Sequence, residues 1–140
     1  MSAATPRGAP PAGYQTVSPY LLCEDADRVV AWLESLGFVE RRSTIGAAGR
    51  THHELVLGED GLVMLGQMAP SFRSLKSQAV ASPVMVHVYV DDVVALHEHA
   101  RATGLEITDL ETSPAGDHRF TATDPEGIPW VFAQRLASGD

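Results

Sequence analysis

The chain has 140 residues, of which 10 are Lys or Arg and 18 are Asp or Glu, so its formal charge is −8. This acidic balance argues against a partner bound through its phosphates, and we expect no nucleic acid partner. No apolar run approaches the roughly 20 residues that a membrane helix needs, so we also expect no membrane partner. Cys23 is the only cysteine, which excludes a disulfide framework and a cysteine-based metal site.

Residues 1–13 are mostly Ala, Pro and Gly and lack the apolar stretch of a signal peptide. We interpret them as a disordered leader and expect a cytoplasmic protein. Beyond the leader, the chain is long enough for one domain with a substantial core.

The chain carries an internal repeat with a spacing of 67 residues. Asp25 precedes an apolar helical pattern that closes at Gly37, and Asp92 and Gly104 repeat this arrangement 67 residues later. Such a repeat predicts a duplicated architecture before any single residue is interpreted. A ligand site between the two copies is the natural expectation.

Apolar periodicity and turn residues predict the same order of elements in both copies. The first copy is predicted to contain a strand at 15–23, a helix at 25–37 and strands at 38–43, 52–57 and 62–65. The second copy is predicted to contain a strand at 84–90, a helix at 93–103 and strands at 105–108, 118–123 and 129–134. The prediction is an α+β fold of two tandem βαβββ modules.

The predicted organisation is a single domain at 14–135, made of module 1 (14–67), a linker (68–83) and module 2 (84–135), followed by a tail at 136–140. On the second helix, His97 and His99 lie two positions apart and therefore on different faces. We expect both to be solvated surface residues. Trp32 and Trp130 are expected in the core.

Several motifs resemble the vicinal oxygen chelate superfamily, which includes glyoxalase I, bleomycin-resistance proteins and extradiol dioxygenases, and in particular its glyoxalase/bleomycin-resistance-like subgroup. The motifs are Val17-Ser18-Pro19-Tyr20-Leu21, His52-His53-Glu54-Leu55, Val90-Asp91-Asp92-Val93, Gly116-Asp117-His118-Arg119-Phe120 and Asp124-Pro125-Glu126-Gly127. The resemblance implies a U-shaped, partly open β-barrel around one cavity, with the helices outside. It also implies a homodimer, in which both subunits can build each cavity.

The resemblance further implies a divalent metal held by one side chain from the first and one from the fourth strand of each module. Counting along the motifs places Ser18, Met85 and Val131 at three of these positions, and Met64 or Leu65 at the fourth. These side chains cannot form a site for a hard or borderline divalent ion. We therefore expect no cofactor and, on balance, no enzymatic activity.

An alternative is a displaced metal site. His52 and Glu54 alternate onto one face of a strand, and His87 shares a face with Met85. Together these three side chains could hold Zn, Ni, Fe or Mn in a metal-dependent lyase, isomerase or dioxygenase. A metal-free enzyme using His87 as a general base, with a tyrosine as acid, is another possibility.

The favoured interpretation is a metal-free protein that binds a small molecule, such as an aromatic or cationic drug or metabolite, in a dimeric cavity. Aromatic faces and negative charge both favour a cation. The expected ligand-binding residues are Ser18, Tyr20, Met85, His87, Tyr89 and Val131.

Overall fold

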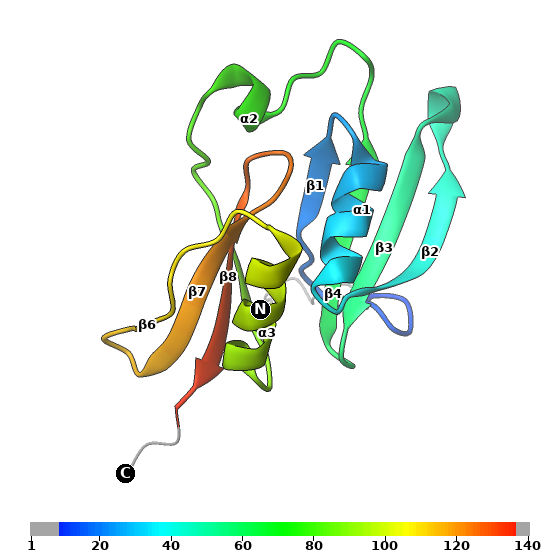
Figure 1. Cartoon of the computed structure of the whole chain (residues 1–140). Helices are drawn as coiled ribbons and strands as arrows, with labels where there is room; N and C mark the ends of the chain where they lie inside the picture. The colour runs from blue at the N-terminus through cyan, green and yellow to red at the C-terminus, as the bar shows by residue number, and fades with distance from the viewer. Residues whose placement is uncertain (1–8, 137–140) are drawn as a thin grey trace, which may run out of the picture.

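The computed structural model describes residues 9–136, so the predictions for residues 1–8 and 137–140 lie outside the described residues (Figure 1). The first half contains β1 (Tyr20–Cys23), α1 (Ala26–Ser35), β2 (Val39–Ile45), a short 3₁₀ helix (Ala47–Gly49), β3 (Thr51–Leu57) and β4 (Gly61–Gln67). The second half contains α2 (Leu75–Gln78), β5 (Val86–Tyr89), α3 (Val93–Thr103), β6 (Glu111–Thr112), β7 (Asp117–Thr123) and β8 (Pro129–Arg135). Apart from α2, which lies in the predicted linker, both halves have the βαβββ order. Within residues 9–136, no helix combines the length and apolar character needed to span a membrane.

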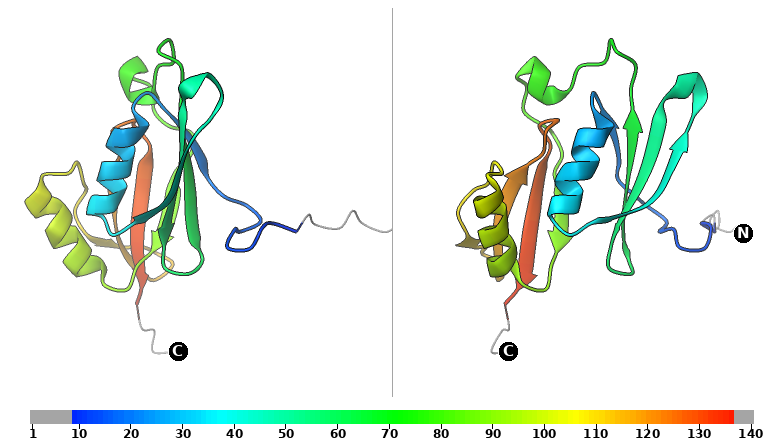
Figure 2. Two further views of the ribbon diagram at one scale, coloured as in Figure 1. Left: turned by 90° about the vertical axis from the view of Figure 1, so that its right-hand side faces the viewer. Right: turned by 45° about the vertical axis from the view of Figure 1, so that its right-hand side comes forward.

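Each half folds into its own four-stranded mixed sheet, with strand orders β1-β4-β3-β2 and β5-β8-β7-β6. In each sheet the first strand runs parallel to the last, and the other neighbours are antiparallel. Figures 1 and 2 show a helix lying against each sheet. The two sheets are separate and do not close into a barrel. The α+β class is therefore confirmed, and the architecture is open.

The strand predicted at residues 105–108 is wrong in detail. Ile107 forms only an isolated bridge there, with Ala122, and the ladder beside β7 is made by β6 instead. The cause lies at the end of α3, where the backbone N–H of Leu105 still donates to the carbonyl of Ala100 at 3.1 Å. The chain is therefore still completing the helix at the start of the predicted strand.

The helix starts reproduce the repeat at the level of single hydrogen bonds. Asp25 and Asp92 each accept the backbone N–H of the residue three positions later, at 3.2 and 3.0 Å. Gln67 and Gln134, which are also 67 residues apart, each accept the N–H of the first helical residue, at 2.8 and 3.0 Å. These contacts satisfy N–H groups that have no partner within the helix.

Trp130 lies at the centre of a core shared by both halves. Its side chain is fully buried, and its ring centroid lies 5.7 Å from that of Trp32 in α1 and 5.8 Å from that of Phe38. The indole N–H donates to the buried carboxyl group of Asp124 at 2.9 Å. Burial raises the pKa of this carboxyl group. Both tryptophans are thus core residues, as the sequence predicts.

Glu126, in the turn between β7 and β8, joins module 2 to the start of α1. Its buried carboxylate accepts the N–H of Glu24 at 2.7 Å and that of Asp25 at 3.1 Å. Its backbone carbonyl accepts the N–H of Lys76 in α2 at 3.1 Å. In Figure 1 this turn, in orange, lies beneath α2 and beside β1. One glutamate therefore contacts both halves and the segment between them.

Glu24 extends the same junction toward the linker. Its carboxylate accepts the hydroxyl hydrogen of Ser77 and, at 2.7 Å, the backbone N–H of Ser74. Hydrogen bonds from Ser77 and Ser74 lower the pKa of Glu24 to about 2. The carboxylate is therefore ionised at neutral pH, and it holds α2 against the rest of the domain.

His97 corrects the expectation of a solvated surface residue. Its side chain is buried, Nε2 lies 2.9 Å from the carbonyl oxygen of Thr108, and its ring meets Phe120 edge to face. His99 is exposed, as expected. The polar imidazole of His97 is tolerated inside because the irregular segment after α3 supplies a carbonyl partner.

We expect Glu126→Ala to destabilise the protein by about 1–3 kcal/mol, because it leaves two backbone N–H groups without their acceptor. The free energy of unfolding, measured by urea denaturation, checks this. Glu98→Ala, on an exposed position of α3, is the control and should change stability little. Equal stability of the two variants would mean that the junction does not depend on this carboxylate.

Candidate functional site

The strand register identifies which residues face away from the helices in each sheet. In the first sheet Tyr20 pairs with Met64, and in the second His87 pairs with Val131. Both pairs lie at equivalent positions of the repeat. Leu65 is fully buried on the opposite side, toward the core. The fourth-strand position left open by the sequence is therefore Met64. We call this side of the two sheets the cavity face.

The residues at the four metal positions do not fit a divalent metal ion. Ser18 precedes β1 and Met85 precedes β5, where Met85 is largely exposed. The set offers one hydroxyl, two thioethers and an isopropyl group, whereas Zn, Fe, Mn and Ni sites are built from imidazole and carboxylate. No chemical step through a metal at these positions can be derived from this chain.

The structure brings together two of the three residues of the displaced metal site. His52 and Glu54 share the cavity face of β3, with His52 Nε2 3.4 Å from a carboxylate oxygen of Glu54. Among the described residues, however, no three His, Cys, Asp or Glu side chains are grouped so that they could hold a metal ion. His87 therefore does not join His52 and Glu54 within one chain.

Glu54 is instead the centre of a hydrogen-bonded cluster, and its side chain is only 4% exposed. The hydroxyl of Tyr14 donates to it at 2.6 Å, and the guanidinium of Arg41 donates through NH2 at 3.0 Å and through Nε at 3.3 Å. Burial raises the pKa of Glu54, but the hydrogen bonds from Tyr14, Arg41 and His52 outweigh it and hold the pKa below its usual value. Glu54 is therefore a buried, ionised carboxylate.

Tyr14 and Arg41 are members of this cluster that sequence analysis did not find. Tyr14 lies in the segment before β1, and the sequence of this segment does not predict a contact with Glu54. Arg41 lies where the pairing of β2 with β3 shifts between Glu40 and Arg42. Such a bulge changes the direction of a side chain, so strict alternation would not place Arg41 beside Glu54. The sequence around Arg41 offered no signal, since it lies between the charged residues Glu40 and Arg42.

The second sheet holds a separate polar group around Tyr89. The hydroxyl of Tyr89 donates to the buried carboxylate of Asp117 at 2.9 Å. Arg135 forms an ion pair with the other carboxylate oxygen at 2.9 Å, and hydrogen bonding to Tyr89 raises the pKa of its guanidinium. The rings of His87 and Tyr89 lie 4.9 Å apart. Tyr89 and His87 were expected in the site, whereas Asp117 and Arg135 were not.

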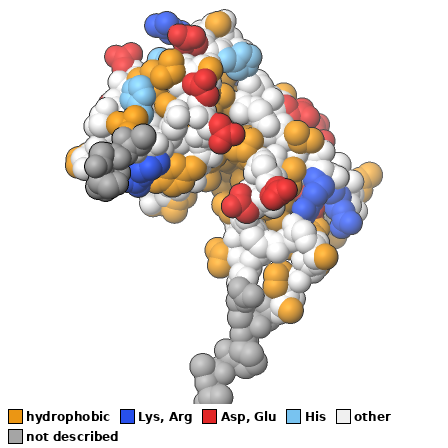
Figure 3. Space-filling view, turned by 90° about the horizontal axis from the view of Figure 1, so that it is seen from below, with side chains coloured by type: hydrophobic (Ala, Val, Ile, Leu, Met, Phe, Trp, Pro, Cys, Tyr) orange, Lys and Arg blue, Asp and Glu red, His pale blue; other side chains and the backbone are white. Residues whose placement is uncertain are grey.

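A pocket of about 380 Å³ lies between the two modules. All four residues of β5, including His87 and Tyr89, line it, and the opposite side is formed mainly by the ends of β3 and β4 with Asp60 at the turn. The apolar lining residues are Pro19, Phe38, Leu57, Leu62, Val63, Val86 and Val88. Figure 3 shows acidic side chains beside hydrophobic ones where the two parts of the molecule meet.

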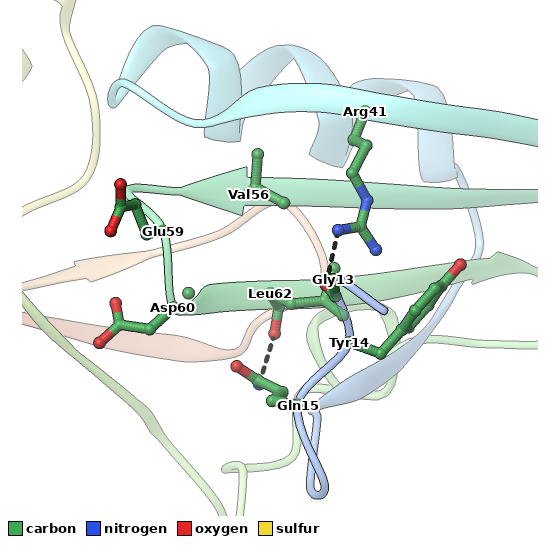
Figure 4. Close-up of a pocket in the computed structure, with 9 residues that line it drawn as sticks. Gly13, Tyr14, Gln15, Arg41, Val56, Glu59, Asp60 and Leu62 are labelled. Atoms are coloured by element: carbon green, nitrogen blue, oxygen red, sulfur yellow. Dashed lines mark hydrogen bonds between the residues drawn. The ribbon is translucent and has the colours of Figure 1, made fainter. Parts of the chain in front are cut away.

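A second pocket, of about 250 Å³, lies beside the first and shares Gln15, Asp60, Gly61 and Leu62 with it. Figure 4 shows Arg41 and Tyr14 at one end of this pocket and Glu59 and Asp60 at the other. The segment before β1 is fixed over the sheet by two bonds drawn there, from Arg41 to the carbonyl of Gly13 at 2.7 Å and from the Gln15 amide to the carbonyl of Leu62 at 3.0 Å.

The expected ligand-binding residues thus fall into three places. His87 and Tyr89 line the pocket between the modules. Tyr20 lies on the cavity face of the first sheet, where its hydroxyl is 2.8 Å from Nδ1 of His52. Ser18, Met85 and Val131 line neither of the two pockets. Within one chain the structure does not gather all six around a single cavity.

The duplicated βαβββ fold defines a class of protein, and comparison with known families identifies it. The model of the Glyoxalase/Bleomycin resistance protein/Dioxygenase superfamily matches residues 13–132. The chain belongs to this superfamily. A comparison with curated proteins gives no match.

Several solved structures share the fold. TioX from Micromonospora sp. ML1 is 29% identical, with a TM-score of 0.63 over 84% of this chain and 95% of that chain. A bleomycin-binding protein complexed with bleomycin is 21% identical, with a TM-score of 0.66 over 88% of this chain and 100% of that chain. TnmS3, an antibiotic-binding protein from Streptomyces sp. CB03234, is 18% identical, with a TM-score of 0.67 over 84% of this chain and 92% of that chain.

We expect Arg41→Ala to destabilise the protein by about 1–3 kcal/mol, because it removes a charged partner from the buried carboxylate of Glu54. Urea denaturation of the two proteins provides the measurement. Arg42→Ala is a matched control, since both arginines are exposed and, of the two, only Arg41 forms an ion pair with Glu54 among the described residues. If both substitutions had the same effect, the ion pair with Glu54 would contribute nothing specific.

Proposed function

We propose that the protein binds a small organic molecule without a metal ion, in the pocket between its two modules. The observation that carries the proposal is the composition of that pocket. Its volume of about 380 Å³ and its mostly apolar lining, with a few polar groups, are typical of small-molecule sites. His87 and Tyr89 supply the hydrogen-bonding groups on one side.

The same pocket favours an aromatic or cationic ligand. The adjacent rings of His87 and Tyr89 offer aromatic faces, and the carboxylate of Asp60 lies among the lining residues. A ring face attracts a cation, and the net charge of −8 adds a favourable field. A planar molecule with a positive group satisfies both features.

The relatives support this class of function. One solved structure is a bleomycin-binding protein in complex with bleomycin, and another is an antibiotic-binding protein. Sequestration of a drug or metabolite is therefore the activity that we assign to this chain. The lack of carboxylate or imidazole at Ser18, Met64, Met85 and Val131 supports binding without a metal.

We further propose that the protein is a homodimer whose cavity is completed by the second copy. Apolar side chains are unusually exposed on or beside the first strands of the two modules: Tyr20 at 48%, Leu22 at 50%, Met85 at 61% and Tyr89 at 55%. Apolar surface of this kind is typical of an interaction face. If the cavity face of module 1 in one copy meets that of module 2 in its partner, Ser18, Tyr20, Met85 and Val131 would join the same cavity as His87.

The ligand proposal is tested by thermal unfolding with bleomycin and with a panel of planar cationic aromatic compounds. A ligand at about 100 times its Kd stabilises the folded state by about 2.7 kcal/mol, which raises the Tm measurably. We expect His87→Ala to weaken the effect, with affinity falling about tenfold for a loss of about 1.4 kcal/mol. His118→Ala, on the opposite face of the second sheet beside Gln134, is the matched control.

The metal content of the purified protein tests whether ligand binding is independent of a metal ion. Protein purified without chelator or affinity tag should contain no stoichiometric Zn, Ni, Fe or Mn. A near-stoichiometric metal ion would overturn metal-free binding and favour the metal-dependent lyase, isomerase or dioxygenase. If no compound of the panel raised the Tm, the proposed class of aromatic or cationic ligand would be contradicted.

The dimer is tested by sedimentation. The chain of 15.0 kDa should sediment as a dimer, and Leu22→Asp should shift it toward the monomer by placing a charge in the apolar contact. Val94→Asp introduces the same charge at an exposed position of α3, away from the cavity face, and should leave the dimer intact. A monomeric wild-type protein would contradict the proposal.

A further inference from the structure

The cavity face of module 1 contains a chain of three side chains that do not line the pocket between the modules. Tyr20 lies on β1, and His52 and Glu54 lie on β3. The hydroxyl of Tyr20 is 2.8 Å from Nδ1 of His52, and Nε2 of His52 is 3.4 Å from Glu54. The three groups therefore form a continuous line from an exposed phenol to a buried carboxylate.

The ionisation of Glu54 determines which atoms donate and which accept in these hydrogen bonds. An ionised carboxylate can only accept, so Nε2 of His52 carries the hydrogen that faces Glu54. In the neutral imidazole Nδ1 is then an acceptor, and the hydroxyl of Tyr20 donates to it. Tyr14 and Arg41 keep Glu54 ionised and in place. The arrangement has the order of a nucleophile, a base and a group that orients the base.

Gly66 makes the contact between Tyr20 and His52 possible. Tyr20 reaches from β1 across β4 to His52, which pairs directly with Gly66. A methyl group at Gly66 would lie 2.9 Å from Cε1 and 3.1 Å from the hydroxyl oxygen of Tyr20. The ring therefore lies on the bare backbone of β4, and a larger residue would displace it.

Module 2 lacks this arrangement although it derives from the same repeat. The residues 67 positions after Tyr20, His52, Glu54 and Gly66 are His87, Arg119, Thr121 and Ala133. Tyr89 is exposed to a similar extent as Tyr20, but its hydroxyl donates to the carboxylate of Asp117 rather than to an imidazole. Tyr89 therefore serves as an internal reference for the reactivity of Tyr20.

We propose that Tyr20, His52 and Glu54 form a nucleophilic triad that accepts an acyl group from an activated ester. The oxygen of Tyr20 bonds to the ester carbonyl carbon while its proton passes to Nδ1 of His52. The ester C–O bond breaks, and its electron pair leaves with the alcohol or phenol oxygen, which takes the proton from His52 directly or through water. Glu54 stabilises the transient imidazolium, and water attack on the acyl-tyrosine, with His52 as base, restores the phenol.

The probe is p-nitrophenyl acetate, added to the full-length protein, with acetylation located by peptide mass spectrometry. We expect Tyr20 to be acetylated faster than Tyr89 in the same molecules. His52→Gln should slow acetylation of Tyr20 by about 10²-fold, which is the lower end of the usual contribution of a general base. Acetylation of Tyr89 should not change in this variant.

Gly66→Ala is the sharpest variant, because it keeps all three side chains and displaces only the ring of Tyr20. It should slow acetylation of Tyr20 as much as His52→Gln does. Gly46→Ala is its matched control, since Gly46 has a negative φ and an added methyl would lie 3.4 Å from the nearest atom. The Tm of each variant verifies folding. Equal acetylation of Tyr20 and Tyr89, or unchanged acetylation of Tyr20 in folded His52→Gln or Gly66→Ala, would overturn the triad. If Gly66→Ala failed to fold, His52→Gln alone would decide.

Discussion

The buried carboxylate of Glu126 is the polar contact that joins the two modules beside the core they share around Trp130. It accepts two backbone N–H groups at the entry to α1, while its own carbonyl holds α2. Charge-assisted bonds of this kind are short and strong, and a small turn can therefore fix a large element. The pocket between the modules lies between β5 and the ends of β3 and β4, so its shape follows from how the modules are joined.

The repeat places a second glutamate at the equivalent position of module 1, but that residue is not buried. The residue 67 positions before Glu126 is Glu59, in the equivalent turn of module 1. Glu126 is buried and holds the junction, whereas Glu59 is exposed and lines the smaller pocket. The glutamate in the turn of module 2 therefore has a structural role, whereas its equivalent in module 1 lines a pocket.

Much of the fold follows from the sequence because its signals are local. The helix caps at Asp25 and Asp92, and the alternation that buries Trp130 while turning Val131 the other way, depend on neighbours along the chain. The misjudged features depend on contacts between distant segments. Arg41 faces Glu54 because of a bulge in β2, and His97 is buried because an irregular segment offers it a carbonyl. Periodicity carries no information about either.

The candidate site divides in the same way. The face shared by His52 and Glu54 was predictable from alternation, and so was the face that His87 shares with Tyr89. The partner of each polar side chain was not, because Tyr14 comes from the segment before β1 and Asp117 from a strand 28 residues beyond Tyr89. Sequence therefore identified the candidate groups but not the networks that determine their chemistry.

The cluster around Glu54 links stability to function. A buried carboxylate is costly unless it is paired and hydrogen-bonded. Tyr14 and Arg41 meet this requirement, and His52 connects Glu54 with Tyr20. A charge buried for stability alone would need no such connection to an exposed phenol. The open contact of Tyr20 across Gly66 is therefore the feature that a purely structural account of this face does not explain.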